Sequence, residues 1–171
     1  MNSCLANIKL LLLDVDGVLT DGGIIYSDSG EQVKTFNSRD GLGLRLLMDS
    51  GIRVGIVTGR RSKALGYRCD NLGITMLFDG IKDKSAALEK IILETGIPAC
   101  DIAFMGDDLI DLPIMKKVGV SICVSDAPEE VKQHSQIITI LEGGRGAVRE
   151  ICESILKAKG LWKNILNRYI S

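Results

Sequence analysis

The chain has 171 residues, of which 46% are hydrophobic and 25% charged, with a formal net charge of −1 at pH 7. This length and composition predict a single domain over residues 1–171 with a substantial buried core. The nearly balanced charge argues against broad electrostatic binding to nucleic acid or to an anionic membrane, so we expect a small-molecule substrate or a protein partner.

The number of cysteines and the lengths of the apolar runs indicate in which cellular compartment the protein is expected. Five cysteines, an odd number without a C-x-x-C pair, argue against a disulfide framework or a zinc site and favour a reducing environment. The apolar run near the start is too short for a signal peptide. No run approaches the roughly 20 apolar residues that a membrane span needs. We therefore expect a cytoplasmic protein.

Short β-rich runs alternate with helical patterns along the chain. Strands are expected at residues 9–15, 54–57, 75–78, 102–105, 120–124 and 137–141. Helices are expected at residues 42–49, 62–72, 84–95, 109–117, 129–133 and 146–159. Continuous apolar strands that alternate with helices predict a parallel sheet with helices on both faces, a three-layer Rossmann-like α/β fold.

Two segments depart from this alternation. Residues 23–37 contain two short β-like runs around Asp28, Ser29 and Gly30, which predicts a small hairpin flap beside the end of the first strand. The tail, residues 161–171, carries apolar residues at helical spacing. These residues need a partner surface, which is either the chain's own core or another subunit.

Polar residues gather where the predicted strands end. Asp14 and Asp16 follow the first strand, Thr58 ends the second, and Asp107 follows the fourth, while Lys84 opens a helix. In open α/β sheets, ligands bind outside the carboxyl ends of the strands. Two acids one residue apart can face the same side and repel each other, and Mg²⁺, which prefers oxygen ligands, relieves that repulsion. An acidic strand end followed by a turn is the alternative interpretation.

These motifs resemble those of the haloacid dehalogenase superfamily of phosphatases. The matching segments are DVDGVLT at 14–20, VTG at 57–59, Lys84, and GDDLID at 106–111. A closer resemblance, through DVDGVLTDG, FNSRDGLGLR, TGRRS, GDDLIDLP and GGRGAVREIC, is to the family of 3-deoxy-D-manno-octulosonate 8-phosphate phosphatases. It covers nearly the whole chain. It implies a fold without a cap domain, a homotetramer, and Mg²⁺-dependent hydrolysis of a phosphorylated keto sugar acid in lipopolysaccharide biosynthesis.

The resemblance also implies roles for individual residues. Asp14 would be the nucleophile that forms an aspartyl-phosphate, Asp16 the general acid and base, and Thr58 and Lys84 the groups that bind the phosphate. Mg²⁺ would be held by Asp14, by the backbone carbonyl of Asp16, and by Asp107. The implied substrate-binding residues are Asp16, Asn37, Ser38, Arg39, Asp40, Gly41, Arg45, Arg60, Arg68 and Lys84.

Several interpretations stay open at this stage. Asp108 and Asp111 are further metal ligands, or Asp111 is an acidic residue at a helix N-terminus. For Arg45 and Arg68 the alternative is a solvated helix face, and Arg145 is a candidate contact to a neighbouring subunit. The substrate is alternatively a nine-carbon keto-acid phosphate or a general sugar phosphate. A non-catalytic assembly domain is the alternative to an enzyme.

Overall fold

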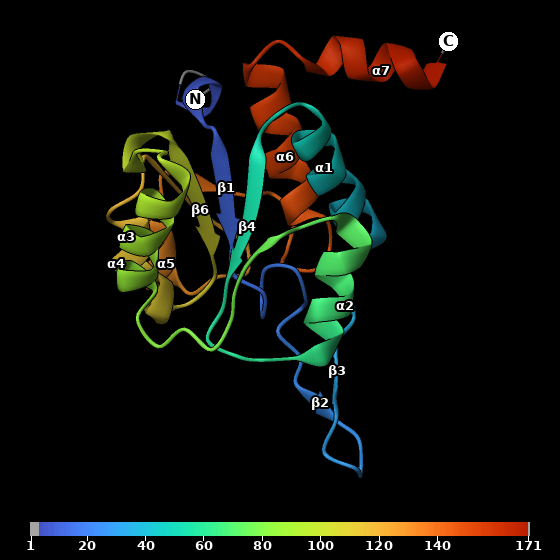
Figure 1. The fold of residues 1–171 in the computed structure, drawn as a ribbon, viewed down its shortest axis with the longest axis vertical. Helices are drawn as coiled ribbons and strands as arrows, with labels where there is room; N and C mark the ends of the chain where they lie inside the picture. Colours follow the sequence, from blue (N-terminus) through green and yellow to red (C-terminus); the bar gives the residue numbers. More distant parts are fainter. Residues whose placement is uncertain (1–3, 171) are drawn as a thin grey trace.

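A six-stranded parallel sheet forms the centre of the structure, a computed structural model that describes residues 4–170 (Figure 1). The strand order is β5-β4-β1-β6-β7-β8, so the first strand lies in the middle. The strands are β1 (Leu10–Leu13), β4 (Arg53–Val57), β5 (Met76–Phe78), β6 (Ile102–Gly106), β7 (Val120–Cys123) and β8 (Ile137–Ile138). The predicted parallel sheet is confirmed.

Helices cover both faces of the sheet. They are α1 (Ser38–Asp49), α2 (Lys63–Leu72), α3 (Lys84–Thr95), α4 (Leu112–Met115), α5 (Glu129–Gln133), α6 (Ala147–Ala158) and α7 (Trp162–Ile170). The first layer holds α1, α2 and α6, and the second holds α3, α4 and α5 (Figure 1). Within residues 4–170 no folded cap interrupts this three-layer arrangement, as predicted.

The strand β1 in the middle of the sheet consists of four leucines, which suits a strand that helices cover on both faces. All four residues of β1 are fully buried, which suits a parallel strand between two helical layers. In the register of the sheet, Leu13 pairs with Ile56 of β4 and with Met105 of β6. The carboxyl ends of these three neighbouring strands therefore lie side by side, and the loops that follow them share one rim of the sheet.

Three expected elements differ from the observed ones by three or more residues at a boundary. The first helix begins at Ser38 rather than 42, because the side chain of Asn37 accepts a hydrogen bond from the Arg39 amide and caps it. The expected helix at 109–117 is instead a 3₁₀ turn (Leu109–Asp111) followed by the short α4. The last strand ends at Ile138 rather than 141, because the Glu150 carboxylate accepts the backbone N–H groups of Ile140 and Leu141 and so takes them out of the sheet.

The predicted flap is present at the carboxyl-terminal rim. Strands β2 (Ile25–Tyr26) and β3 (Gln32–Val33) pair antiparallel and project beyond the sheet (Figure 1). Gly30 makes the turn with a φ of 79°, a conformation that glycine adopts without a steric cost. The apolar side chains of Ile25 and Tyr26 are more than half exposed. The flap therefore presents apolar surface on an isolated two-stranded hairpin.

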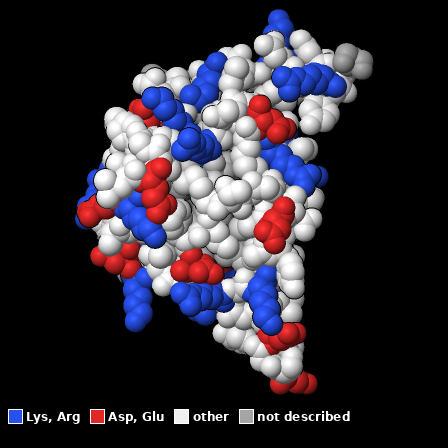
Figure 2. Space-filling view, in the orientation of Figure 1, with Lys and Arg blue, Asp and Glu red and all other residues white. Residues whose placement is uncertain are grey.

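The tail forms the helix α7, which packs only in part on its own chain. Ile165 is buried, and the Trp162 ring lies 5.6 Å from the Arg149 guanidinium carbon of α6. Leu166 and Tyr169 stay exposed. No helix in residues 4–170 has the length and hydrophobicity that crossing a bilayer requires. On the face shown in Figure 2, basic and acidic side chains are interspersed rather than gathered by sign.

Candidate active site

The loops after β1, β4 and β6 enclose an open cleft of about 250 Å³ at the rim of the sheet. The residues that line it come from all three loops and from the start of the flap: Asp14, Asp16, Gly22, Ile24, Thr58, Gly59, Arg60, Asp107, Asp108 and Ile110. The cleft thus gathers side chains from motifs that lie more than 90 positions apart in the sequence. This is the position that the sheet topology predicts for a ligand.

A buried lysine joins two carboxylates at the floor of the cleft. The Lys84 Nζ lies 2.9 Å from Oδ2 of Asp14 and 2.5 Å from Oδ1 of Asp111. All three residues are at most 5% exposed. Burial by itself would lower the pKa of Lys84, but the two carboxylates outweigh it and raise that pKa. Lys84 is therefore a fixed positive charge beside Asp14.

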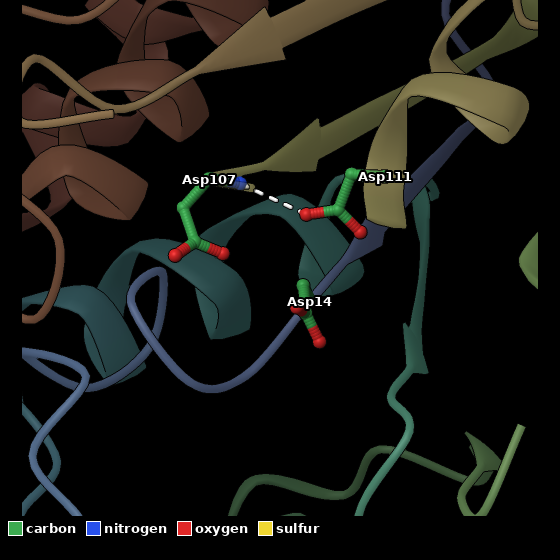
Figure 3. Close-up of side chains that lie close together, drawn as sticks. All are labelled: Asp14, Asp107 and Asp111. Carbon is green, nitrogen blue, oxygen red and sulfur yellow. Dashed lines mark hydrogen bonds between the residues drawn. The ribbon is translucent and has the colours of Figure 1, made fainter. Parts of the chain in front are cut away.

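Asp111 organises the loop that carries the other acids. Its Oδ2 accepts a hydrogen bond from the backbone N–H group of Asp107, at 2.9 Å (Figure 3), and another from that of Asp108, at 3.3 Å. Its Oδ1 accepts from Lys84, so protein donors already occupy both carboxylate oxygens. A Cβ at Gly106 would overlap this carboxylate, which explains the glycine before the acidic run. This bonding supports the interpretation of Asp111 as a positioning residue at a turn.

Three carboxylates crowd together above Lys84. Asp14, Asp107 and Asp111 offer oxygen atoms that all lie within 4.8 Å of one another (Figure 3). Burial, and then repulsion from Asp111 and Asp14, raises the pKa of Asp107 to about 8. Burial, and then repulsion from Asp111, raises the pKa of Asp14 to about 6. Lys84 alone does not neutralise this cluster.

The donor set fits a divalent cation. Oδ1 of Asp14 is buried and has no hydrogen-bond partner, which costs free energy unless a positive group satisfies it. Crowded carboxylates are the hard oxygen ligands that Mg²⁺ takes. Gly17 turns the chain with a φ of 83°, and a Cβ there would overlap the Asp107 carboxylate. The loop after β1 therefore approaches Asp107 closely only because residue 17 is glycine.

The Asp16 carboxylate contacts a lysine of the flap and an arginine of the loop after β4. Both acids follow the end of β1 rather than lying in the strand, so strand alternation does not set their directions. Oδ1 of Asp16 pairs with the ammonium of Lys34, and Oδ2 lies 3.5 Å from Nε of Arg60. Sequence reasoning missed Lys34, which lies 18 positions from Asp16 and belongs to no motif.

Thr58 stands at the end of β4, on the wall of the cleft beside Asp14. It is 2% exposed, and its backbone is held by Phe78 and Ile81 of the neighbouring strand and loop. Its hydroxyl oxygen accepts a hydrogen bond from the Arg60 amide at 3.4 Å. The structure thus brings Thr58 and Arg60 into the predicted cleft.

The predicted substrate-binding residues of α1 and α2 lie outside this cleft. The Arg68 guanidinium donates to the Asn37 carbonyl at 3.0 Å, and the Asp40 carboxylate accepts from the Arg149 amide at 2.8 Å. These contacts join α1 to α2 and to α6. The same region holds Gly41, while Ser38 and Arg39 are exposed and Arg45 donates to the Asn71 carbonyl. For these residues the role in substrate binding stays a prediction.

Known proteins are similar to this chain in sequence and in fold. The model of the haloacid dehalogenase-like hydrolase family matches residues 77–149. The 3-deoxy-D-manno-octulosonate 8-phosphate phosphatase of Escherichia coli K12 is 47% identical over 154 residues, which cover 90% of this chain and 82% of that protein.

Two solved structures of phosphatases with the same name extend the similarity to three dimensions. The one from Yersinia pestis is 44% identical with a TM-score of 0.93, over 95% of this chain and 88% of that one. The one from Moraxella catarrhalis, solved with magnesium, phosphate and KDO, is 40% identical with a TM-score of 0.96, over 98% and 97% of the two chains. The chain belongs to the 3-deoxy-D-manno-octulosonate 8-phosphate phosphatase family of haloacid dehalogenase-like hydrolases.

Proposed function

We propose that the protein is a Mg²⁺-dependent phosphomonoesterase that hydrolyses 3-deoxy-D-manno-octulosonate 8-phosphate to the keto sugar acid and phosphate, in lipopolysaccharide biosynthesis. The observation that carries this proposal is the environment of Asp14. Its carboxylate is buried at the rim of the sheet, one oxygen is held by Lys84, and the other has no hydrogen-bond partner. The named relatives support the choice of substrate.

Asp14 acts as the nucleophile in this proposal. One carboxylate oxygen forms a bond to phosphorus while the ester bond to the sugar oxygen breaks, and the product is an aspartyl-phosphate. Water then attacks the same phosphorus, which breaks the bond to Asp14 and releases phosphate. A carboxylate nucleophile in this way divides one difficult displacement into two easier ones.

Asp16 moves the protons in both steps. It donates a proton to the departing sugar oxygen and later takes one from the attacking water. Such general acid–base assistance typically contributes about 10²–10⁴-fold in rate. Thr58 and Lys84 bind the phosphoryl oxygens, and the fixed charge of Lys84 offsets the negative charge on both reacting groups.

Asp14, Asp107 and the backbone carbonyl of Asp16 would hold the metal ion. When bound, Mg²⁺ neutralises the carboxylate cluster and polarises the phosphoryl oxygens. The buried Asp14 oxygen without a hydrogen-bond partner and the raised pKa of Asp107 support this assignment. Asp111 contributes by fixing the loop through its two backbone hydrogen bonds.

We also propose that the protein is a homotetramer of single-domain chains in the cytoplasm. Exposed apolar side chains on the flap and on α7, among them Tyr26 and Tyr169, support association. Ser38, Arg39 and Arg145 are exposed, so a neighbouring chain can reach them. The buried thiols Cys69, Cys123 and Cys152 suit a reducing compartment. Native mass spectrometry tests the assembly, and an active monomer would refute it.

A phosphate-release assay tests the proposed activity. The purified protein is incubated with Mg²⁺ and a panel that contains the eight-carbon keto-acid phosphate, a nine-carbon keto-acid phosphate and common sugar phosphates. We expect the highest kcat/KM for the eight-carbon compound and no release by Asp14→Asn, whose side chain has the same shape. A higher kcat/KM for another compound would make that compound the proposed substrate instead. Full activity of Asp14→Asn would refute the mechanism.

A further inference from the structure

The flap reaches back into the cleft through one lysine. Lys34 directly follows β3, and its ammonium pairs with Oδ1 of Asp16. The Lys34 side chain is only 3% exposed, whereas that of Arg60, which approaches the other Asp16 oxygen, is 51% exposed. Asp16 therefore lies between two cations, and the buried one belongs to the flap.

Burial makes this ion pair different from an ordinary surface pair. Exposed lysine–carboxylate pairs are weak because water screens them and long side chains move freely. A buried ammonium is costly unless a carboxylate faces it, so the position of Lys34 is tied to that of Asp16. The aliphatic stem of Lys34 is also enclosed, which restricts the directions that its charge can take.

On the basis of the proposed function, we propose that Lys34 is a positioning residue that holds the Asp16 carboxyl group in place for proton transfer. When Asp14 bonds to phosphorus, the electron pair of the broken ester bond leaves on the sugar oxygen. For this step Asp16 is protonated, with a proton taken from water as the substrate binds, and the departing sugar oxygen takes that proton. Asp16 then returns to the carboxylate that pairs with Lys34 in the structure. Lys34 itself neither gains nor loses a bond.

In this proposal, proton transfer depends on the hairpin, whereas phosphate binding depends on the sheet and on α3. Thr58 and Lys84 stand on the sheet and on α3, where packing fixes them. Lys34 stands on the hairpin, whose two strands pair only with each other. The acid–base step therefore requires that the flap lies against the cleft, whereas phosphate binding does not.

The leaving group of the substrate distinguishes this role from a purely structural one. A sugar phosphate releases a strongly basic alkoxide that needs a proton, whereas p-nitrophenyl phosphate releases a weakly basic phenolate that does not. The ratio kcat/KM reports the steps up to release of this group, before the aspartyl-phosphate is hydrolysed. A variant with a misplaced acid therefore loses kcat/KM for the sugar phosphate far more than for the aryl phosphate.

The variant Lys34→Met keeps the aliphatic stem and removes the charge. We expect its kcat/KM to fall about 10- to 100-fold for the eight-carbon keto-acid phosphate and less than about 3-fold for p-nitrophenyl phosphate. Lys34→Arg, which restores a cation, should regain part of the loss. Lys116→Met, at an exposed lysine on the end of α4, is the matched control. Thermal unfolding of each variant shows whether the fold is kept.

A double-mutant cycle asks whether Lys34 acts through Asp16. In an Asp16→Asn background, Lys34→Met should lower kcat/KM for the sugar phosphate only slightly further, because the effects of two substitutions that remove the same interaction do not add. Equal losses on both substrates, additive losses in the cycle, or a raised KM with kcat intact would each overturn the role of Lys34. A wild-type protein that releases phosphate from neither ester would instead refute the proposed function, and this inference with it.

Discussion

Because three carboxylates lie close together near the floor of the cleft, we expect one of them, Asp107, to destabilise the metal-free protein. Asp107 has a pKa of about 8 in the folded chain against an ordinary 3.8, so the folded state binds its proton more tightly than the unfolded state does. The stability that this proton provides is complete below pH 3.8 and is lost as the pH rises toward 8. We therefore expect Asp107→Asn, which removes the charge and keeps the shape, to stabilise the metal-free protein at neutral pH.

The size of the effect follows from the pKa difference. At 1.36 kcal/mol per unit, the raised pKa of Asp107 lowers the stability of the folded chain by at most about 5 kcal/mol at pH 7.5 and by about 1.6 kcal/mol at pH 5. Water entry and small movements of the side chains relieve part of this cost. We expect Asp107→Asn to gain at least about 1 kcal/mol at pH 7.5, which raises the melting temperature of a chain of this length by about 2–4 °C.

Thermal unfolding with and without Mg²⁺ tests this reasoning. After treatment with a chelator, Asp107→Asn should melt above the wild type at pH 7.5 and by a clearly smaller margin at pH 5. Mg²⁺ at about 100 times its Kd should stabilise the wild type by about 2.7 kcal/mol, and the variant much less. Asp49→Asn, at an exposed acid, is the control. The reasoning would be refuted if metal-free Asp107→Asn melted below the wild type, or if its increase in melting temperature were the same at pH 5 and pH 7.5.

Two further substitutions test the geometry of the site. Gly17→Ala should destabilise the protein by at least about 1 kcal/mol and weaken Mg²⁺ binding in calorimetry, because the new Cβ overlaps Asp107. Gly51→Ala, with the same positive φ and open space around it, should show backbone strain alone and bind Mg²⁺ normally. Lys84→Met should cost about 3–5 kcal/mol in chemical denaturation, because it leaves two buried carboxylates without their cation, whereas Lys116→Met should cost little. Normal Mg²⁺ affinity in Gly17→Ala, or an unchanged denaturation midpoint in Lys84→Met, would contradict this geometry.

The parts of the site that stand on the sheet were predictable from the sequence. Apolar runs with helices between them indicate a parallel sheet, and in such a sheet the residues after each strand meet at one rim. Asp14, Thr58 and Asp107 are the residues that directly follow β1, β4 and β6. These three strands are neighbours in the sheet, so the three side chains share a cleft. Each position follows from a strand end, which is a local property of the sequence.

The contacts between distant surface elements were not predictable in this way. Lys34 reaches Asp16 from a hairpin whose angle to the sheet no local pattern specifies. Likewise, no pattern in the sequence indicated that the Asp40 carboxylate accepts a hydrogen bond from the Arg149 amide at the start of α6, 109 positions away. That bond depends on how closely α1 and α6 pack. A sequence pattern indicates which face of a helix is buried but not which neighbouring helix covers it.

The structure separates the two halves of the proposed reaction physically. Asp14, the proposed nucleophile, is held by Lys84, which also pairs with the fully buried Asp111, so the proposed phosphoryl-transfer centre is buried at the rim of the sheet. Asp16, the proposed proton donor, has a side chain that is 20% exposed and pairs with Lys34 of the flap. A change that loosens the flap should therefore slow alkyl esters selectively, whereas a change in the core should slow every substrate alike. On this proposal, the range of leaving groups that the protein can release depends on the hairpin, and its capacity to accept a phosphoryl group depends on the sheet.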